Sequence, residues 1–335
     1  MKFGIFLPTY ARASFPDSIR IAVLAEKVGF DSVWAADHMI NPDYQVAGLG
    51  GEPGRPETLE PFVVLSYVAA LTKNVRLGTL VTPIPRSQTP MHLAKTVATL
   101  DIASNGRSIL GAGVGWYKQE FLTYGFGWQS FDIRYEIMME GVQVIKKLWT
   151  KERTDFEGKH YHLSNAVLMP KPVQRPAPPI WFGGYSERIV KATASLGDGW
   201  IPWALTPESY RQRLALLKRL CKESGRQETE IKPALSTLAH IGSDYDSVRR
   251  KVNGNLRIWA LGEAKVDFRG ITRLKEMEDA SILGGPEDCI GQIEKLVQAG
   301  VEYIVLGAVP IDHTYDFVKS FGEKVVPHFV QHNRT

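Results

Sequence analysis

The sequence has few of the features that mark several protein classes. Only two of its 335 residues are cysteines, Cys221 and Cys289, and they lie far apart without a CxxC spacing. This excludes a disulfide-stabilised scaffold and fits a reducing compartment. The 40 Lys and Arg residues barely exceed the 36 Asp and Glu residues, and the two signs are interspersed. We therefore expect no nucleic-acid partner, whereas a small anionic ligand suits this mild positive charge.

Long apolar runs are also missing. No stretch approaches the roughly 20 apolar residues that a membrane span needs. The apolar run "FGIFL" near the N-terminus is too short for a signal peptide and ends at Pro8. These features predict a soluble, cytoplasmic protein without a membrane partner.

Several common catalytic arrangements are absent from the sequence. It offers no Ser-His-Asp order, no close carboxylate pair and no HExxH motif. His160 and His162 are two residues apart in an alternating segment, and no third ligand lies nearby in sequence. A surface pair is therefore favoured over a metal site, and we expect no metal.

What the chain does have is a regular alternation of short apolar segments and helical patterns. Each apolar segment is followed by a predicted helix, and the segments are centred near residues 5, 33, 78, 109, 181, 200, 236 and 304. Eight βα units with apolar strands predict an α/β fold, a (β/α)8 TIM barrel. The alternative is a doubly wound sheet with a C-terminal cap.

Three segments interrupt this alternation. Residues 37–60 form a long loop rich in Gly and Pro, and residues 150–178 read as a hairpin with a proline-rich return. Residues 244–285 are polar and mostly helical over 244–280, beside the predicted site, where they would set specificity. Because the βα alternation resumes after the hairpin, we interpret residues 1–335 as a single domain with inserted hairpin and loop segments.

A barrel places its site at the C-terminal ends of the strands, where this chain has mainly glycine and aromatic residues. The glycines of "GAGVG" (111–115) fit poorly with a dinucleotide fingerprint, because they follow the fourth strand and the nearest acid at a suitable distance, Asp132, opens a helix. A loop whose backbone approaches a ligand explains them better, and a tight turn is the plain alternative. A rim of this composition suits a flat ring held by the main chain.

Two further strand ends carry candidate residues. Gly183 and Gly184 precede a helix that Ser186 could cap, which indicates either an anion site or an ordinary N-cap. Asp37 and His38 end the second strand, where a histidine can exchange protons with a substrate. The alternative is a capping Asp beside a half-buried His.

In their order along the chain, these stretches resemble the bacterial-luciferase-like family of (β/α)8 flavin and deazaflavin oxidoreductases. The resemblance covers nearly the whole chain and is carried by "FGIFLP", "GFDSVWAADH", "RLGTLVTPIPRSQTPMHLAKTVATLDIASNGRSILGAGVGWYKQEF", "IKKLW" and "PIWFGGYSERIVKATASLGDGW".

The resemblance implies a cofactor site. It places a non-prolyl cis peptide at Leu80–Val81 behind the middle ring, Asp37 and His38 at the ring edge, and the phosphate at Gly183–Ser186. On this view the glycines clear space for the ring. The implied cofactor-binding residues are Asp37, His38, Thr79, Leu80, Val81, Thr82, Gly113, Val114, Gly115, Trp116, Gly183, Gly184, Tyr185 and Ser186.

The family divides by cofactor, and "GVGWYKQEF" with Gly125 and Arg134 looks more like the F420-dependent subgroup than the FMN branch. The first hypothesis is an F420-dependent oxidoreductase in which hydride passes between the deazaflavin C5 and a small organic substrate. His38 would be the catalytic residue that exchanges the proton, with Asp37 fixing its orientation. The alternatives are an FMN monooxygenase fed by a separate flavin reductase and a flavin-binding protein without turnover. A homodimer is implied as well.

One position departs from the family pattern. The F420-dependent sugar-phosphate dehydrogenases have an acidic residue where this chain has Trp116, and Glu120 lies one helical turn further on, where we expect it to fall short of the site. A sugar-phosphate substrate is therefore disfavoured. Trp116, Trp203 and Tyr185 favour an apolar or planar substrate instead.

Overall fold

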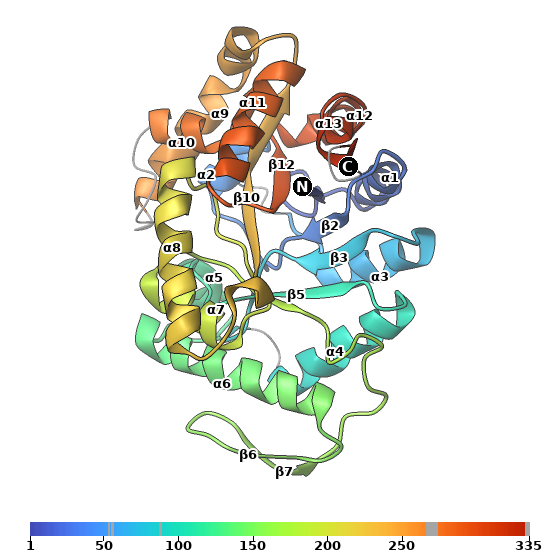
Figure 1. Ribbon diagram of the computed structural model, residues 1–335, viewed down its shortest axis with the longest axis vertical. Coiled ribbons are helices and arrows are strands. Elements are labelled where there is room, and N and C mark those ends of the chain that lie inside the picture. The colour runs from blue at the N-terminus through green and yellow to red at the C-terminus, as the bar shows by residue number, and fades with distance from the viewer. Residues whose placement is uncertain (53, 55–56, 87–88, 266–273, 332–335) are drawn as a thin grey trace.

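The computed structural model describes residues 1–52, 54, 57–86, 89–265 and 274–331, and its centre is a closed ring of eight parallel strands (Figure 1). The ring closes because β10 pairs with both β9 and β12, and β12 pairs with β1. This confirms the predicted (β/α)8 barrel, and every predicted strand centre lies inside a strand. In ring order the strands are β1 (Lys2–Phe6), β2 (Ser32–Ala35), β3 (Arg76–Thr79), β5 (Ser108–Gly113), β8 (Ile180–Phe182), β9 (Gly199–Trp200), β10 (Lys232–Ile241) and β12 (Tyr303–Ala308).

Helices surround the ring, and many of them begin with a proline or a capping side chain. Thr206 caps α8 by accepting a hydrogen bond from the Ser209 N–H, and Pro207 follows at the first helical position. In the part of the chain that the structure describes, none of the helices is long and apolar enough to cross a membrane. The helices are α1 (Phe15–Lys27), α2 (Asp43–Gly48), α3 (Pro61–Leu71), α4 (Pro90–Ala103), α5 (Lys118–Thr123), α6 (Phe131–Thr150), α7 (Glu187–Leu196), α8 (Pro207–Glu223), α9 (Tyr245–Lys265), α10 (Leu274–Ala280), α11 (Pro286–Gln298), α12 (Thr314–Lys324) and α13 (Val326–Gln331).

The predicted hairpin is present as β6 (Thr154–Glu157) and β7 (His162–Ala166), which pair antiparallel outside the barrel, beyond α6 (Figure 1). Glu140 of α6 holds the hairpin by accepting hydrogen bonds from the backbone N–H groups of residues 159–161. His160 and His162 each pair with a glutamate, at 3.2 and 3.1 Å respectively.

The other two insertions lie on the barrel. Residues 37–60 contain α2, and residues 244–285 contain α9, α10 and the short strand β11 (Ile282–Gly284), which pairs with β10. The sequence analysis missed β11, because three residues are too few to show a period. Residues 53, 55–56 and 266–273 of these insertions lie outside the described residues.

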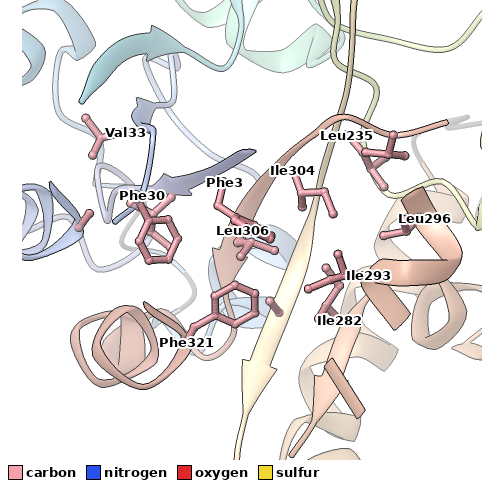
Figure 2. Packing of buried hydrophobic residues seen from close by; sticks show 14 of the residues in the cluster. Phe3, Phe30, Val33, Leu235, Ile282, Ile293, Leu296, Ile304, Leu306 and Phe321 are labelled. Atoms are coloured by element: carbon pink, nitrogen blue, oxygen red, sulfur yellow. The ribbon is translucent and has the colours of Figure 1, made fainter. Parts of the chain in front are cut away.

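The hydrophobic core fills the layer between the barrel and its helices. Figure 2 shows Phe3 of β1 and Leu306 of β12 close to Phe321 of α12, with Ile293 of α11 on the other side of the cluster. The Phe3 and Phe321 rings meet edge to face, with centroids 5.7 Å apart. This packing holds the strands in register, and their C-terminal ends therefore present the following loops at fixed positions.

Candidate active site

A cavity of about 750 Å³ opens at the C-terminal ends of the strands. Its walls come from the loops after the strands and from the helical insertions, and they are mostly apolar. The structure brings most of the predicted cofactor-binding residues to this cavity, namely Asp37, His38, Leu80, Val81, Gly113, Val114, Gly115, Trp116, Gly183, Gly184, Tyr185 and Ser186.

The assignment of Thr79 and Thr82 to the cofactor site is corrected by the structure. Both side chains are buried behind the cavity wall. The Thr79 hydroxyl accepts a hydrogen bond from the Gly111 N–H at 3.1 Å and donates to the Gly111 carbonyl oxygen, and the Thr82 hydroxyl donates to Thr79. These hydroxyls therefore join β3 to β5 and are not available to a ligand.

The floor of the cavity is built around Val81. The Leu80–Val81 peptide bond is cis, as the resemblance implied. A β-carbon at Gly113 would lie 2.7 Å from a Val81 methyl carbon, and one at Gly183 would lie 2.8 Å from another. Glycine at these two positions therefore makes room for the Val81 side chain. At these two positions the space that glycine leaves is taken by Val81, whereas a β-carbon at Gly115 would meet the Phe121 ring.

A buried arginine that the sequence analysis overlooked organises the rim. The Arg86 Nη2 donates to the Asp37 carboxylate at 2.5 Å and to the Asp37 carbonyl oxygen at 2.7 Å. Its Nε lies 3.4 Å from the Glu120 carboxylate, and only 4% of the Arg86 side chain is exposed. Buried charges of this kind need opposite charges nearby, so Arg86 and its two carboxylates form one unit.

Glu120 is the partner of His38. Its carboxylate accepts a hydrogen bond from the Met39 N–H at 2.5 Å and lies 3.3 Å from His38 Nδ1. Two expectations are thereby corrected: Glu120 does reach the site, and it is Glu120 that orients His38, because the Asp37 carboxylate is taken by Arg86. Glu120 reaches His38 although it lies one helical turn beyond Trp116, because α5 forms part of the cavity wall.

The charge of Glu120 determines the tautomer of His38. Burial raises the pKa of Glu120, but the hydrogen bond from His38, the charges of His38 and Arg86, and the Met39 N–H lower it more, so its pKa lies below the usual value. An anionic Glu120 favours the tautomer in which His38 Nδ1 carries the proton and donates a hydrogen bond to the carboxylate, and Nε2 is then the nitrogen left to exchange a proton. The His38 side chain is 17% exposed and lines the cavity.

The first turn of α7, after β8, forms another part of the rim. The Ser186 hydroxyl caps this helix by accepting a hydrogen bond from the Ile189 N–H, and the Trp200 indole donates to the Gly184 carbonyl oxygen at 2.8 Å. The N-cap interpretation of Ser186 is thus correct, and the positive end of the helix dipole faces the cavity as an anion site requires.

Several residues of the site and its supporting cluster carry no clear local signal in the sequence. Arg86 follows an ordinary apolar run, and its carboxylate partners are 34 and 49 positions away. Arg134 had been noted only as part of the resemblance; it stacks on Trp128, with its guanidinium carbon 3.5 Å from the ring centroid. Trp259 and Ser236 also line the cavity.

The sequence pattern of the family described as luciferase-like monooxygenase matches residues 1–303. The chain belongs to this family of oxidoreductase enzymes. The resemblance drawn from the sequence is therefore confirmed.

Relatives cover nearly the whole chain. An F420-dependent glucose-6-phosphate dehydrogenase of Amycolatopsis mediterranei is 26% identical over 93% of both chains. A phthiodiolone/phenolphthiodiolone dimycocerosates ketoreductase of Mycobacterium kansasii is 26% identical over 85% of this chain and 88% of its own. The name of the first relative agrees with the F420-dependent subgroup that the sequence resembles.

Solved structures share the fold. An F420-dependent secondary alcohol dehydrogenase in complex with an F420-acetone adduct superposes with a TM-score of 0.82 at 23% identity, covering 97% of this chain and 98% of its own. A long-chain alkane monooxygenase reaches the same TM-score at 17% identity, covering 99% of this chain and 92% of its own. The barrel is therefore common to enzymes of both kinds, and the site must decide between them.

The Val81 floor yields a double-mutant prediction. Gly183→Ala places a methyl group against Val81, so we expect the free energy of unfolding to fall by about 1–3 kcal/mol. Adding Val81→Ala removes the collision, and the double variant should be more stable than the two single effects summed predict. Urea unfolding measures all three variants. Gly291→Ala is the control, since a β-carbon there has open space. Purely additive effects would contradict this packing.

The Glu120 cluster yields a pH prediction. A folded-state pKa below the unfolded value means that the unfolded chain binds more protons in that window, so stability is lost as the pH falls through it. We expect Glu120→Gln to lower stability at pH 7 by about 2–4 kcal/mol, because Arg86 loses a partner. We also expect it to flatten the decline between about pH 5 and pH 3. Urea unfolding across this range, with exposed Glu323→Gln as the control, makes the measurement. Parallel pH curves for Glu120→Gln and wild type would refute the assignment.

Proposed function

We propose that the chain is an F420-dependent oxidoreductase that acts on a small organic substrate. The observation that carries the proposal is the His38–Glu120–Arg86 unit, which presents an exchangeable proton to a largely apolar cavity. Relatives with F420-dependent names over nearly the full length support this choice of cofactor.

The residues present fit a flat, anionic cofactor. The Val81 side chain offers an apolar surface to one face of a ring, and the α7 N-terminus offers N–H groups and a positive dipole to a phosphate.

Side chains of this protein would donate and accept the proton of the reaction. When bound, the reduced deazaflavin supplies a hydride, which carries two electrons. His38 Nε2 would deliver the proton that completes reduction of a carbonyl group to an alcohol, and it would accept that proton in the reverse direction. Glu120 would stabilise the imidazolium form and hold the ring in place, and Arg86 would keep Glu120 anionic.

Cofactor binding tests the proposal directly. Titration of the apoprotein with oxidised F420, followed by fluorescence quenching, should show micromolar affinity, and FMN should bind much more weakly. The reverse preference would favour an FMN monooxygenase fed by a separate flavin reductase. Tight F420 binding without reduction by any donor would favour a carrier protein.

His38→Gln tests the proton site. Because the amide cannot exchange a proton, we expect turnover to fall by about 10²–10⁴-fold. F420 affinity should stay near the wild-type value, which fluorescence titration checks. Exposed His92→Gln serves as the control. Turnover within a few-fold of wild type would remove His38 from the mechanism.

We also propose that two copies pair through α3. This helix has no charged residue, and its outer face exposes Val63, Tyr67 and Leu71 at four-residue spacing, with Leu71 51% exposed. A helix that is apolar on all sides is normally covered on all sides, and the inner face already packs on the barrel. A second copy of the same stripe would cover the outer face.

The pairing is tested by oligomeric state. Wild type should be a dimer in size-exclusion chromatography with light scattering, and Leu71→Glu should shift it toward the monomer by placing a carboxylate in the apolar contact. Exposed Ser195→Glu on α7 is the control. A monomeric wild-type protein would refute the pairing.

A further inference from the structure

We propose that Gln45 is a specificity-determining residue whose side-chain amide binds a neutral carboxamide or lactam group of the substrate. This inference rests on the proposed function and adds a second functional group to the substrate class, apart from the carbon that exchanges the hydride. Gln45 belongs to α2, in the insertion after β2, and it lines the cavity. The sequence analysis placed this position in the long loop 37–60 without assigning it a role.

The Gln45 side chain is buried without a bonding partner. Only 8% of the residue is exposed. Its backbone groups are bonded, because the Gln45 N–H donates to the Pro42 carbonyl oxygen at 2.9 Å and the Gln45 carbonyl oxygen accepts from the Leu49 N–H at 3.0 Å. Among the residues that the structure describes, none forms a hydrogen bond with the side-chain amide. Since a buried polar group without a partner is unfavourable, this amide marks a place for a ligand.

The Gln45 amide is accessible, in contrast to other unbonded polar groups near the site. The amide atoms of Asn41 and the Nε1 atom of Trp203 also have no partner, but they are sealed inside the protein. The nitrogen and oxygen of the Gln45 side chain are not sealed in this way. Because Gln45 is otherwise buried and lines the cavity, the surface that these two atoms keep faces the cavity.

The fold holds this amide in a fixed place. Gln45 and Leu49 are four residues apart, so they lie on one face of a helical turn, and both line the cavity. The Leu49 carbonyl oxygen accepts a hydrogen bond from the Ile311 N–H at 2.9 Å, and a β-carbon at Gly48 would lie 2.6 Å from the Trp259 ring. The segment is thus anchored to the loop after β12 and to α9, and a ligand meets an amide that needs little reorganisation.

The hydrogen-bonding capacity of the amide selects the group that it binds. Gln45 offers N–H donors on Nε2 and an acceptor on Oε1, side by side in one plane. A carboxamide or lactam presents the complementary pair and forms two hydrogen bonds. A ketone oxygen satisfies the donor alone, a carboxylate also only accepts and loses its hydration in an apolar cavity, and a hydrocarbon satisfies neither. The complementary guest is therefore a neutral amide on a mostly apolar body.

Equilibrium binding to the complex with oxidised F420 tests which group Gln45 binds. Benzamide, acetophenone and isopropylbenzene have nearly the same shape, and they carry an amide, a carbonyl acceptor alone and no polar group, respectively. Ligand-observed NMR titration would compare wild type with Gln45→Met, which keeps the side-chain length and removes the amide. We expect benzamide to bind about tenfold more weakly to the variant and acetophenone about threefold more weakly, with isopropylbenzene unaffected.

The matched control for this series is Gln298→Met at the exposed end of α11, which should leave all three affinities unchanged. Equal losses for the three ligands in Gln45→Met would mean that the variant disturbs the cavity in general, and an unchanged benzamide affinity would mean that the amide binds nothing there. Either result would overturn the proposal.

Gln45→Glu provides a gain-of-binding test. The carboxylate keeps the shape of the side chain but only accepts hydrogen bonds. Benzamidinium, a cation of the same shape as benzamide, should therefore bind at least about tenfold more tightly to this variant than to wild type, and benzamide should bind more weakly. Urea unfolding checks that both variants are folded. No gain for benzamidinium in folded Gln45→Glu would contradict the orientation of this side chain toward the cavity, and if the variant does not fold, Gln45→Met decides.

F420 affinity separates this inference from the proposed function. If Gln45→Met weakens F420 binding as much as benzamide binding, the amide serves the cofactor, and the inference is wrong. If wild type binds no F420, the proposed function fails. The same ligand series with the apoprotein then decides the role of Gln45 separately, by whether the loss in Gln45→Met is selective for benzamide.

Discussion

The site depends on one buried ion cluster. Arg86, in the loop after β4 (Thr82–Pro83), holds the carboxylates of Asp37 and Glu120, which come from the loop after β2 and from α5. Isolated charges at this depth would be very unfavourable, so each of the three elements can adopt its position only with the other two. Glu120 then positions His38. A single cation therefore connects the barrel loops to His38, the proposed proton site.

The cavity floor is held in place by steric fit, whereas the rim is held by ion pairs. Val81 fits between Gly113 and Gly183, and any side chain there would meet its methyl groups. Behind this floor the Thr79 hydroxyl bonds the β5 backbone and the Thr82 hydroxyl donates to Thr79, which leaves an apolar surface toward the cavity. The floor and the rim can therefore be disturbed separately. A change of side-chain volume affects the floor, and a change of charge affects the rim.

Much of this could be predicted from the sequence because the signals are local. Apolar runs marked the eight barrel strands, and the strand ends marked Asp37, His38 and Gly183. The links between strand ends could not be predicted in this way. Arg86 and Glu120 are 34 positions apart, and nothing near either residue indicates the other. The direction of the Thr79 hydroxyl likewise depends on the Gly111 backbone of a neighbouring strand, and β11 is too short to show a period.

This arrangement explains how the site accommodates a tryptophan at position 116. Trp116 meets the His38 ring edge to face, with centroids 5.7 Å apart, where an acidic side chain would have exposed its charge to the substrate. The carboxylate that acts on His38 is Glu120, whose side chain is only 1% exposed. The negative charge therefore acts mainly through the imidazole, although Glu120 belongs to the cavity wall. Because Arg86 compensates the Glu120 carboxylate, an apolar guest can approach His38 without facing an uncompensated charge.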